Sequence, residues 1–261
     1  MKDIDTKKVA SDLFDALKGQ YCLDPLTQRY PEISIEDAYS ISLHLLEKRL
    51  EAGEHLIGKK IGVKSKVVQE MLGVHQPDFG FLTSEMQILN KSTVSIKDLL
   101  IQPRAEGEIA FILSKDLQGP GINAEDVLNS TEYILPCFEI VDSRIDNWKI
   151  AIQDTIADDA SCGIFVLGDD KRDPHEIELD KCKLKVYKNG NFLSQGQGSA
   201  VQGHPCKAIA WLANTLGEFN IPFKAGEIIL SGSLVPLEPV VCGDEMYLEL
   251  EGVGSAEIKF I

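Results

Sequence analysis

The apolar residues nearest the N-terminus recur at helical spacing. A stripe of four apolar side chains ends at Gly19, a residue type that commonly terminates helices. Its members are Ile4, Val9, Leu13 and Leu17. We therefore expect a first helix in this segment.

A second helix is predicted to begin at Ser34. Asp37 follows three positions later, a capping-box pattern in which each residue satisfies the backbone amide of the other. The helix is expected to end near Gly53, and a proline-containing connector, residues 24–31, precedes it. Its apolar residues are Ala38, Ile41, Leu45 and Leu46.

From about residue 56 the pattern changes to short apolar runs bounded by glycines, which is typical of strands. A short helix is expected after Ser65, and beyond residue 100 one helix, residues 204–216, interrupts the strands. The expected strands cover residues 56–63, 105–113, 133–141, 164–167, 184–193 with a turn at Asn189-Gly190, 227–230, and 246–261 with a turn near Gly252.

These elements predict an α+β fold without internal repeats or an evident linker. Residues 1–55 form a helical N-terminal subdomain in this interpretation, and residues 56–261 form a β-rich core. With 261 residues and 44% hydrophobic content, the chain is long enough to bury a full core.

The charge balance argues against a polyanionic partner. Asp and Glu number 41 against 26 Lys and Arg, so the formal charge of −15 would repel nucleic acid and anionic membranes. Most of this excess is expected on the solvated surface, although part of it could belong to a cation site.

No apolar run approaches the roughly 20 residues that a membrane helix needs, and the charged N-terminus lacks a signal-peptide pattern. We expect a soluble, cytoplasmic protein. The six cysteines are scattered without paired short spacings, which argues against a zinc knuckle or a disulfide framework and favours reduced packing residues.

The most informative stretch is Pro103 to Leu113, where two carboxylates open an apolar strand. Glu106 and Glu108 are two positions apart, so they share one face of the strand about 6.5 Å apart at the backbone. Buried side by side they would repel each other unless a cation lay between them. Gly107 allows close approach to this backbone. The alternative is a solvent-facing pair on a strand edge.

A third carboxylate, Glu139, lies in the apolar run 134–141, where a buried charge requires a partner. Three carboxylates without clustered histidines favour Mg²⁺ or Mn²⁺ over zinc, because hard cations prefer oxygen ligands.

Other polar residues leave two interpretations open. Lys60 lies in a glycine-rich strand, where it could act in acid/base chemistry or bind a carboxylate, but a surface lysine is the default. Asp78 follows Pro77, so a turn-forming aspartate is its default. Residues 142–144 (Asp-Ser-Arg) could anchor a ligand or form an ion pair at a strand end.

The motifs resemble, in order and nearly end to end, the 2-oxopent-4-enoate hydratases (2-hydroxypenta-2,4-dienoate hydratases) of aromatic meta-cleavage, within the fumarylacetoacetate hydrolase superfamily. The strings that carry the resemblance are residues 57–63, 72–82, 101–113, 138–144, 160–168, 211–217 and 230–240. The resemblance implies a mixed β-sandwich roll as the core.

It also implies the site. The family's metal ligands match Glu106, Glu108 and Glu139, and its active-site lysine matches Lys60. Asp78 and Ser161 match positions near the substrate pocket. The implied reaction adds water to 2-hydroxypenta-2,4-dienoate, with Mg²⁺ or Mn²⁺ as cofactor and a 2-oxo acid as product.

Two positions and one short segment depart from the family pattern. Asp159 stands in Asp-Asp-Ala-Ser where an asparagine is usual, and Lys64 stands in place of a threonine. Residues 201–205 (Val-Gln-Gly-His-Pro) also differ. Their Gly-His-Pro step is closer to the pattern of the related 4-oxalocrotonate decarboxylases. These changes concern the pocket around the metal.

Three other functions compete with the hydratase interpretation. A 2-oxo-3-hexenedioate (4-oxalocrotonate) decarboxylase shares the fold and the glutamates. A carbon–carbon hydrolase would need a His/Glu dyad, which we do not find in the sequence. A non-catalytic subunit that binds the decarboxylase would have no reason to hold Lys60 and three glutamates. By resemblance we expect a homo-oligomer, with a possible complex with 4-oxalocrotonate decarboxylase.

Overall fold

The computed structural model describes residues 4–62 and 77–261. The predicted helix after Ser65 and the change at Lys64 lie outside the described residues. Three helices open the chain: α1 (Thr6–Gly19), the one-turn α2 (Leu26–Arg29) inside the expected connector, and α3 (Ile35–Glu51). The Ser34–Asp37 capping box begins α3 as predicted.

Two sheets follow. The larger has the order β2-β1-β10-β5-β6-β7-β3, with β11 paired to β5. Its strands are β1 (Leu56–Gly62), β2 (Asp78–Thr83), β3 (Gln87–Ile88), β5 (Arg104–Leu113), β6 (Thr131–Val141), β7 (Ile164–Leu167), β10 (Ile228–Leu230) and β11 (Glu238–Pro239). It is mixed, because β1 runs parallel to β10 and antiparallel to β2.

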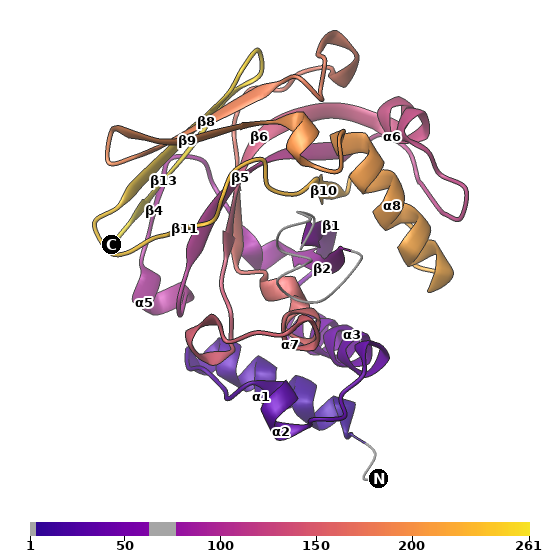
Figure 1. The fold of residues 1–261 in the computed structure, drawn as a ribbon, viewed down its shortest axis with the longest axis vertical. Helices are drawn as coiled ribbons and strands as arrows, with labels where there is room; N and C mark the ends of the chain where they lie inside the picture. Colours follow the sequence, from indigo (N-terminus) through magenta and orange to yellow (C-terminus); the bar gives the residue numbers. More distant parts are fainter. Residues whose placement is uncertain (1–3, 63–76) are drawn as a thin grey trace.

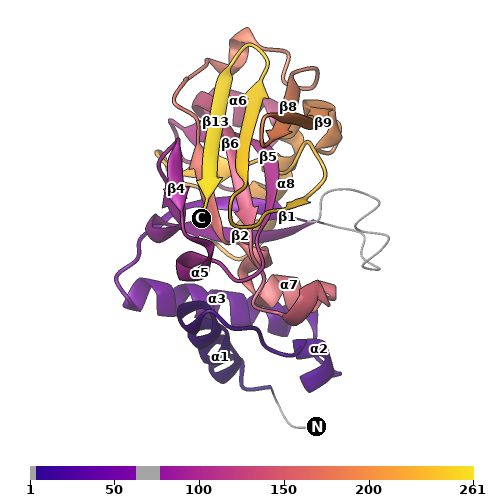
Figure 2. The ribbon, with the colours of Figure 1, turned by 90° about the vertical axis from the view of Figure 1, so that its left-hand side faces the viewer.

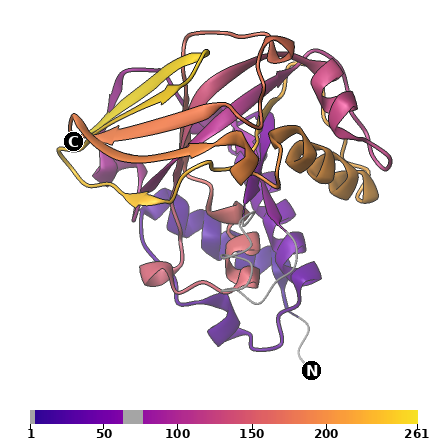
Figure 3. The same ribbon diagram turned by 45° about the horizontal axis from the view of Figure 1, so that its top comes forward.

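The smaller sheet has the order β4-β13-β12-β8-β9. Its strands are β4 (Ser92–Val94), β8 (Lys183–Lys188), β9 (Asn191–Gln197), β12 (Glu245–Leu250) and β13 (Gly254–Phe260). The predicted hairpin turn at Asn189-Gly190 joins β8 to β9, with positive φ at both residues, as a type I′ turn requires. Figure 3 shows this sheet together with α8 (Pro205–Glu218).

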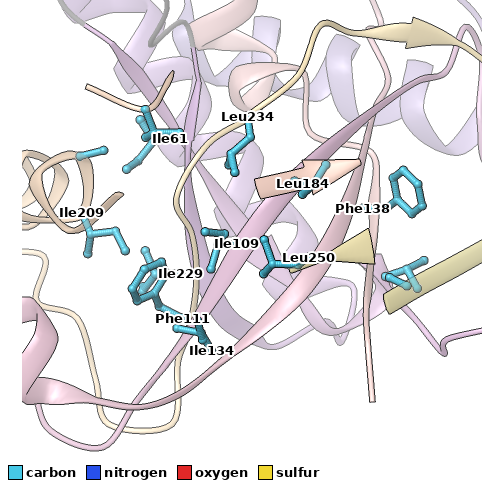
Figure 4. Close-up of a cluster of buried hydrophobic side chains, with 14 of the residues drawn as sticks. Ile61, Ile109, Phe111, Ile134, Phe138, Leu184, Ile209, Ile229, Leu234 and Leu250 are labelled. Atoms are coloured by element: carbon cyan, nitrogen blue, oxygen red, sulfur yellow. The ribbon is translucent and has the colours of Figure 1, made fainter. Parts of the chain in front are cut away.

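The main apolar core lies between the two sheets and α8. It joins alternate residues of β5, such as Ile109 and Phe111, to Leu184 and Leu250 of the smaller sheet and Ile209 of α8 (Figure 4). The other face of the larger sheet carries a second cluster that includes Ala110 and Ile112. Both faces of β5 are therefore buried, which explains its nearly continuous apolar sequence.

The N-terminal helices have a core of their own, but they share it with a later segment. Val9, Leu13 and Ile41 pack with Ile152 and Ile156 of α7 (Ile152–Ala157). Figures 1 and 2 show α1, α2, α3 and α7 gathered at one end of the molecule, below the strands. The division of the chain at residue 56 stays a prediction.

The expected α+β organisation, a mixed sandwich roll preceded by helices, is confirmed. The expectation of one helix beyond residue 100 is wrong, because α6 (Ala124–Ser130) and α7 also occur there. Both are too short to show helical periodicity, although Asn123 and Asp126 form a capping box. Among the described residues, no helix combines the length and apolar content needed to cross a membrane.

Candidate metal and active site

Three glutamates meet on the face of the larger sheet that turns away from the main core. Glu106 and Glu108 are two positions apart on β5, and Glu139 on β6 is the direct antiparallel partner of Glu106. One oxygen from each carboxylate lies within 4.8 Å of the others, and all three residues are buried. Strand alternation thus brings together the residues predicted from their spacing. The solvent-facing alternative is wrong.

Lys60 completes this cluster from β1. Its Nζ lies 2.9 Å from Oε1 of Glu139, and its side chain is only 2% exposed. On a flat sheet, β1 and β6 would be about 14 Å apart, because β10 and β5 lie between them. The larger sheet must therefore curve around the site. The default of a surface lysine is wrong for this reason.

The surroundings keep Lys60 charged. Burial lowers the pKa of its ammonium group, but the charges of Glu139, Cys162, Asp78 and Glu106 together outweigh burial and raise the pKa above its ordinary value. The charged ammonium form of Lys60 is therefore favoured in this cluster.

The glutamates differ in how the protein supports them. Oε2 of Glu108 accepts a hydrogen bond from the Gly232 backbone N–H at 2.7 Å. Neither oxygen of Glu139 accepts a hydrogen bond from a described residue, and its contact with Lys60 is an ion pair outside hydrogen-bonding geometry. A fully buried carboxylate in this state has coordination sites left for a cation.

Asp78 also lies on this face. It is the first residue of β2 and is 1% exposed, so the expectation of a turn aspartate is wrong. Gly62 is its partner on β1, and a Cβ at Gly62 would lie 2.3 Å from Oδ1 of Asp78. A glycine is needed there to make room for the carboxylate.

Ser161 is buried beside the cluster rather than within it. Its hydroxyl lies 3.1 Å from that of Thr155, and its carbonyl accepts a hydrogen bond from Asp142 N–H. The next residue, Cys162, lies close enough to Glu139 and Lys60 for their charges to affect the pKa of its thiol. Ser161 therefore lies next to a residue that borders the cluster.

Arg144 and Asp142 take the structural one of their two interpretations. Arg144 Nε donates to Asp158 at 2.5 Å, and the oxygens of Asp142 accept backbone N–H bonds from Ile101 and Gln102. Sequence reasoning missed the role of Asp158, because residues 153–159 hold three aspartates and the sequence does not show which of them turns inward.

For Cys137 the sequence predicts only a packing role. It is the partner of Glu108 across β5 and β6. Burial raises the pKa of its thiol well above the ordinary value, so the thiol stays protonated and is a poor metal ligand. The donors at this site are therefore oxygens, which suit a hard divalent ion such as Mg²⁺ or Mn²⁺.

A mixed sheet curved around three buried carboxylates and a lysine defines an α+β protein with an acidic cluster that could hold a divalent metal. The chain belongs to the fumarylacetoacetate hydrolase family, since residues 59–261 match the family described as "Fumarylacetoacetate (FAA) hydrolase C-terminal".

Two proteins with similar sequences are named as hydratases. A 2-hydroxyhexa-2,4-dienoate hydratase of Comamonas testosteroni is 59% identical over 249 residues, covering 95% of this chain and 94% of the relative. A 2-hydroxypent-2,4-dienoate hydratase of Pseudomonas putida is 58% identical over 214 residues, covering 82% and 96%.

A solved structure has the same fold over the whole chain. The 4-oxalocrotonate decarboxylase of Pseudomonas putida G7, complexed with magnesium and adipate, superposes with a TM-score of 0.96 at 30% identity, covering 100% of this chain and 99% of that one. The sandwich roll expected from the resemblance is therefore confirmed.

Proposed function

We propose that this chain is a divalent-metal-dependent hydratase that converts 2-hydroxypenta-2,4-dienoate and water to 4-hydroxy-2-oxopentanoate during meta-cleavage of aromatic compounds. The observation that carries the proposal is the buried cluster of Glu106, Glu108 and Glu139 with Lys60 against it. Two relatives named as dienoate hydratases, at 59% and 58% identity, support the same reaction.

In this proposal Glu106, Glu108 and Glu139 hold Mg²⁺ or Mn²⁺, in keeping with their oxygen donors. The bound ion supplies a positive charge that stabilises the enolate-like charge of a 2-oxo acid. The strand ladder between β5 and β6 holds Glu106 and Glu139 in place before any ligand arrives.

Lys60 acts in proton transfer. The enol proton of the substrate is lost and carbon 5 gains one, which gives a conjugated 2-oxo-3-enoate. Water then adds its oxygen at carbon 4 and a proton at carbon 3. In this proposal Lys60 delivers a proton or polarises the attacking water, and Asp78 and Ser161 border the substrate. The burial of all three residues supports these roles.

The remaining predictions belong to the same proposal. Residues 1–55 form a helical subdomain attached to the catalytic core, residues 56–261. The protein acts in the cytoplasm as a homo-oligomer, and it forms a complex with a 4-oxalocrotonate decarboxylase that supplies its substrate.

The test is to give the purified chain 2-hydroxypenta-2,4-dienoate with Mg²⁺, with Mn²⁺ and after metal removal, and to follow 4-hydroxy-2-oxopentanoate. Turnover that requires the metal is expected. The structural similarity to the decarboxylase makes 2-oxo-3-hexenedioate, a longer diacid, the second substrate to assay. Carbon dioxide release from that diacid alone would establish a decarboxylase, and decarboxylase binding without turnover would establish a subunit.

A further inference from the structure

Three consecutive residues beside the candidate site have an unusual backbone. Asp159, Ala160 and Ser161 have φ values of 55°, 51° and 53°. L-residues adopt this left-handed region rarely and as single residues rather than in runs, because Cβ then crowds the following carbonyl. A run of three persists only where surrounding contacts enforce it.

Arg144 makes such contacts on both sides of this turn. Its Nη2 donates to the carbonyl of Asp158, just before the turn, at 2.6 Å, and Nη1 donates to the carbonyl of Cys162, just after it, at 2.7 Å. The Asp158 carboxylate accepts from Nε at 2.5 Å and from the Arg144 backbone N–H at 2.8 Å. Both side chains are fully buried, so the planar guanidinium is locked in one orientation.

The turn lies against the strands that carry the site. Gly80 of β2 is the partner of Lys60, and a Cβ at Gly80 would lie 2.5 Å from the carbonyl oxygen of Asp159. On the other side, the Asp142 backbone N–H donates to the carbonyl of Ser161 at 2.9 Å. The turn therefore connects the strand beside Lys60 to the end of β6.

We propose that the Arg144–Asp158 pair is a clamp that holds the left-handed turn Asp159–Ser161 in place beside Lys60, which makes Arg144 a positioning residue for the reaction. This inference rests on the proposed function. Without the forked hydrogen bonds of the Arg144 guanidinium, the turn relaxes toward the right-handed region and shifts Ser161. Glu106 and Glu139 stay where the strand ladder holds them, so metal binding is retained.

The test compares Arg144→Lys with wild type in the full-length chain. Lysine keeps the charge but loses the fork. We expect kcat/KM for 2-hydroxypenta-2,4-dienoate to fall about 100-fold, the cost of a displacement of about 1 Å in a site. Mg²⁺ affinity, measured by titration calorimetry, should stay within about threefold of wild type, because the strand ladder still holds the glutamates. A tenfold change would need about 1.4 kcal/mol of binding free energy.

A second substitution separates the clamp from a general loss of packing. Glycine adopts positive φ without strain, so Ala160→Gly in the Arg144→Lys background should restore a large part of kcat/KM. Arg49→Lys is the matched control, since Arg49 is also buried and paired with a carboxylate, that of Glu54, and lysine keeps the positive charge that acts on Asp159. It should leave exchange in the turn unchanged.

Amide hydrogen exchange of residues 159–162 gives a readout independent of turnover. Exchange should be faster in Arg144→Lys and in Asp158→Asn, and slower again in the Ala160→Gly double variant. Unchanged exchange, or an equal loss of Mg²⁺ affinity and kcat/KM without rescue, overturns the clamp. If wild type does not hydrate the dienoate, the proposed function fails, and exchange alone decides on the clamp. Should Arg144→Lys not fold, Asp158→Asn decides it by the same criteria.

Discussion

Lys59 and Lys60 are neighbours on β1, and each is buried against a glutamate on opposite faces of the larger sheet. Lys59 Nζ lies 2.6 and 2.5 Å from the two oxygens of Glu227, above the ring of Phe223. Lys60 Nζ lies 2.9 Å from Glu139 in the candidate site. Neighbouring side chains on a strand point to opposite faces of the sheet. Lys59 therefore points into the main core, where it pairs with Glu227, while Lys60 faces the glutamate cluster.

This arrangement separates the effects of two equivalent substitutions. Lys60→Met should lower kcat by about 100- to 10,000-fold, the range for loss of a proton-transfer group. Lys59→Met should leave kcat of the folded protein within a few-fold, but it should cost about 3 kcal/mol of unfolding free energy, because Glu227 loses its ion-pair partner and, among the described residues, keeps only the hydrogen bond from the Lys224 backbone N–H. Steady-state kinetics and urea unfolding of both variants measure these effects. Comparable kcat values for the two variants would refute the assignment of Lys60.

Glu106→Gln should weaken Mg²⁺ binding. Loss of a group that only supports a metal ligand costs 10- to 100-fold in affinity, so loss of a ligand should raise the Mg²⁺ Kd by at least about 100-fold. Titration calorimetry measures the Kd. Glu132→Gln is the matched control, because Glu132 is exposed near the start of β6, the strand that carries Glu139. Unchanged Mg²⁺ affinity in Glu106→Gln would remove Glu106 from the ligand set.

Metal binding should also stabilise the fold, because it relieves repulsion among three buried carboxylates. At a free Mg²⁺ concentration of about 100 times Kd, the stabilisation is about 2.7 kcal/mol. For a chain of this size Tm should rise by about 5–10 °C. Thermal unfolding with Mg²⁺ and with chelator measures the shift. The shift should vanish in a Glu106→Gln/Glu108→Gln double variant, and an equal shift there would place the metal elsewhere.

Local patterns in the sequence were sufficient for much of the fold. Helical periodicity and the Ser34 cap predict α3, and alternation predicts that Glu106 and Glu108 share a face of β5. These features depend on neighbours within a few positions, so one sequence suffices for them. The partner of Glu106 on β6 could not be predicted in this way, because the register of β5 with β6 is set by contacts between residues distant in the chain.

Local sequence patterns could not predict which polar side chains are buried. Lys60 reaches Glu139 only because the sheet curves, and Arg144 meets Asp158 only because α7 returns the chain to the end of β6. Lysine and arginine are usually exposed, so the local sequence pattern predicted a surface position for Lys60, which is wrong. The family resemblance corrected this default where spacing alone did not.

Asp159 makes stability depend on pH near neutrality. Burial raises the pKa of its carboxyl group to about 7, although the Phe81 N–H bond and the charges of Arg49, Arg144 and Lys60 act to lower it. Because the pKa is higher in the folded than in the unfolded chain, the folded state binds the extra proton. The stability contributed by this group is present below pH 4 and is lost as pH rises toward 7.

Asp159→Asn removes this titration and retains an oxygen that can accept the Phe81 N–H bond, which is 2.8 Å long in the structure. The variant should therefore be more stable than wild type at pH 8, and this advantage should shrink as the pH falls to 5. Urea unfolding of both proteins across this range measures the difference. A difference that is the same at pH 5 and pH 8 would mean that Asp159 is ionised throughout, and that the nearby Arg49, Arg144 and Lys60 outweigh its burial.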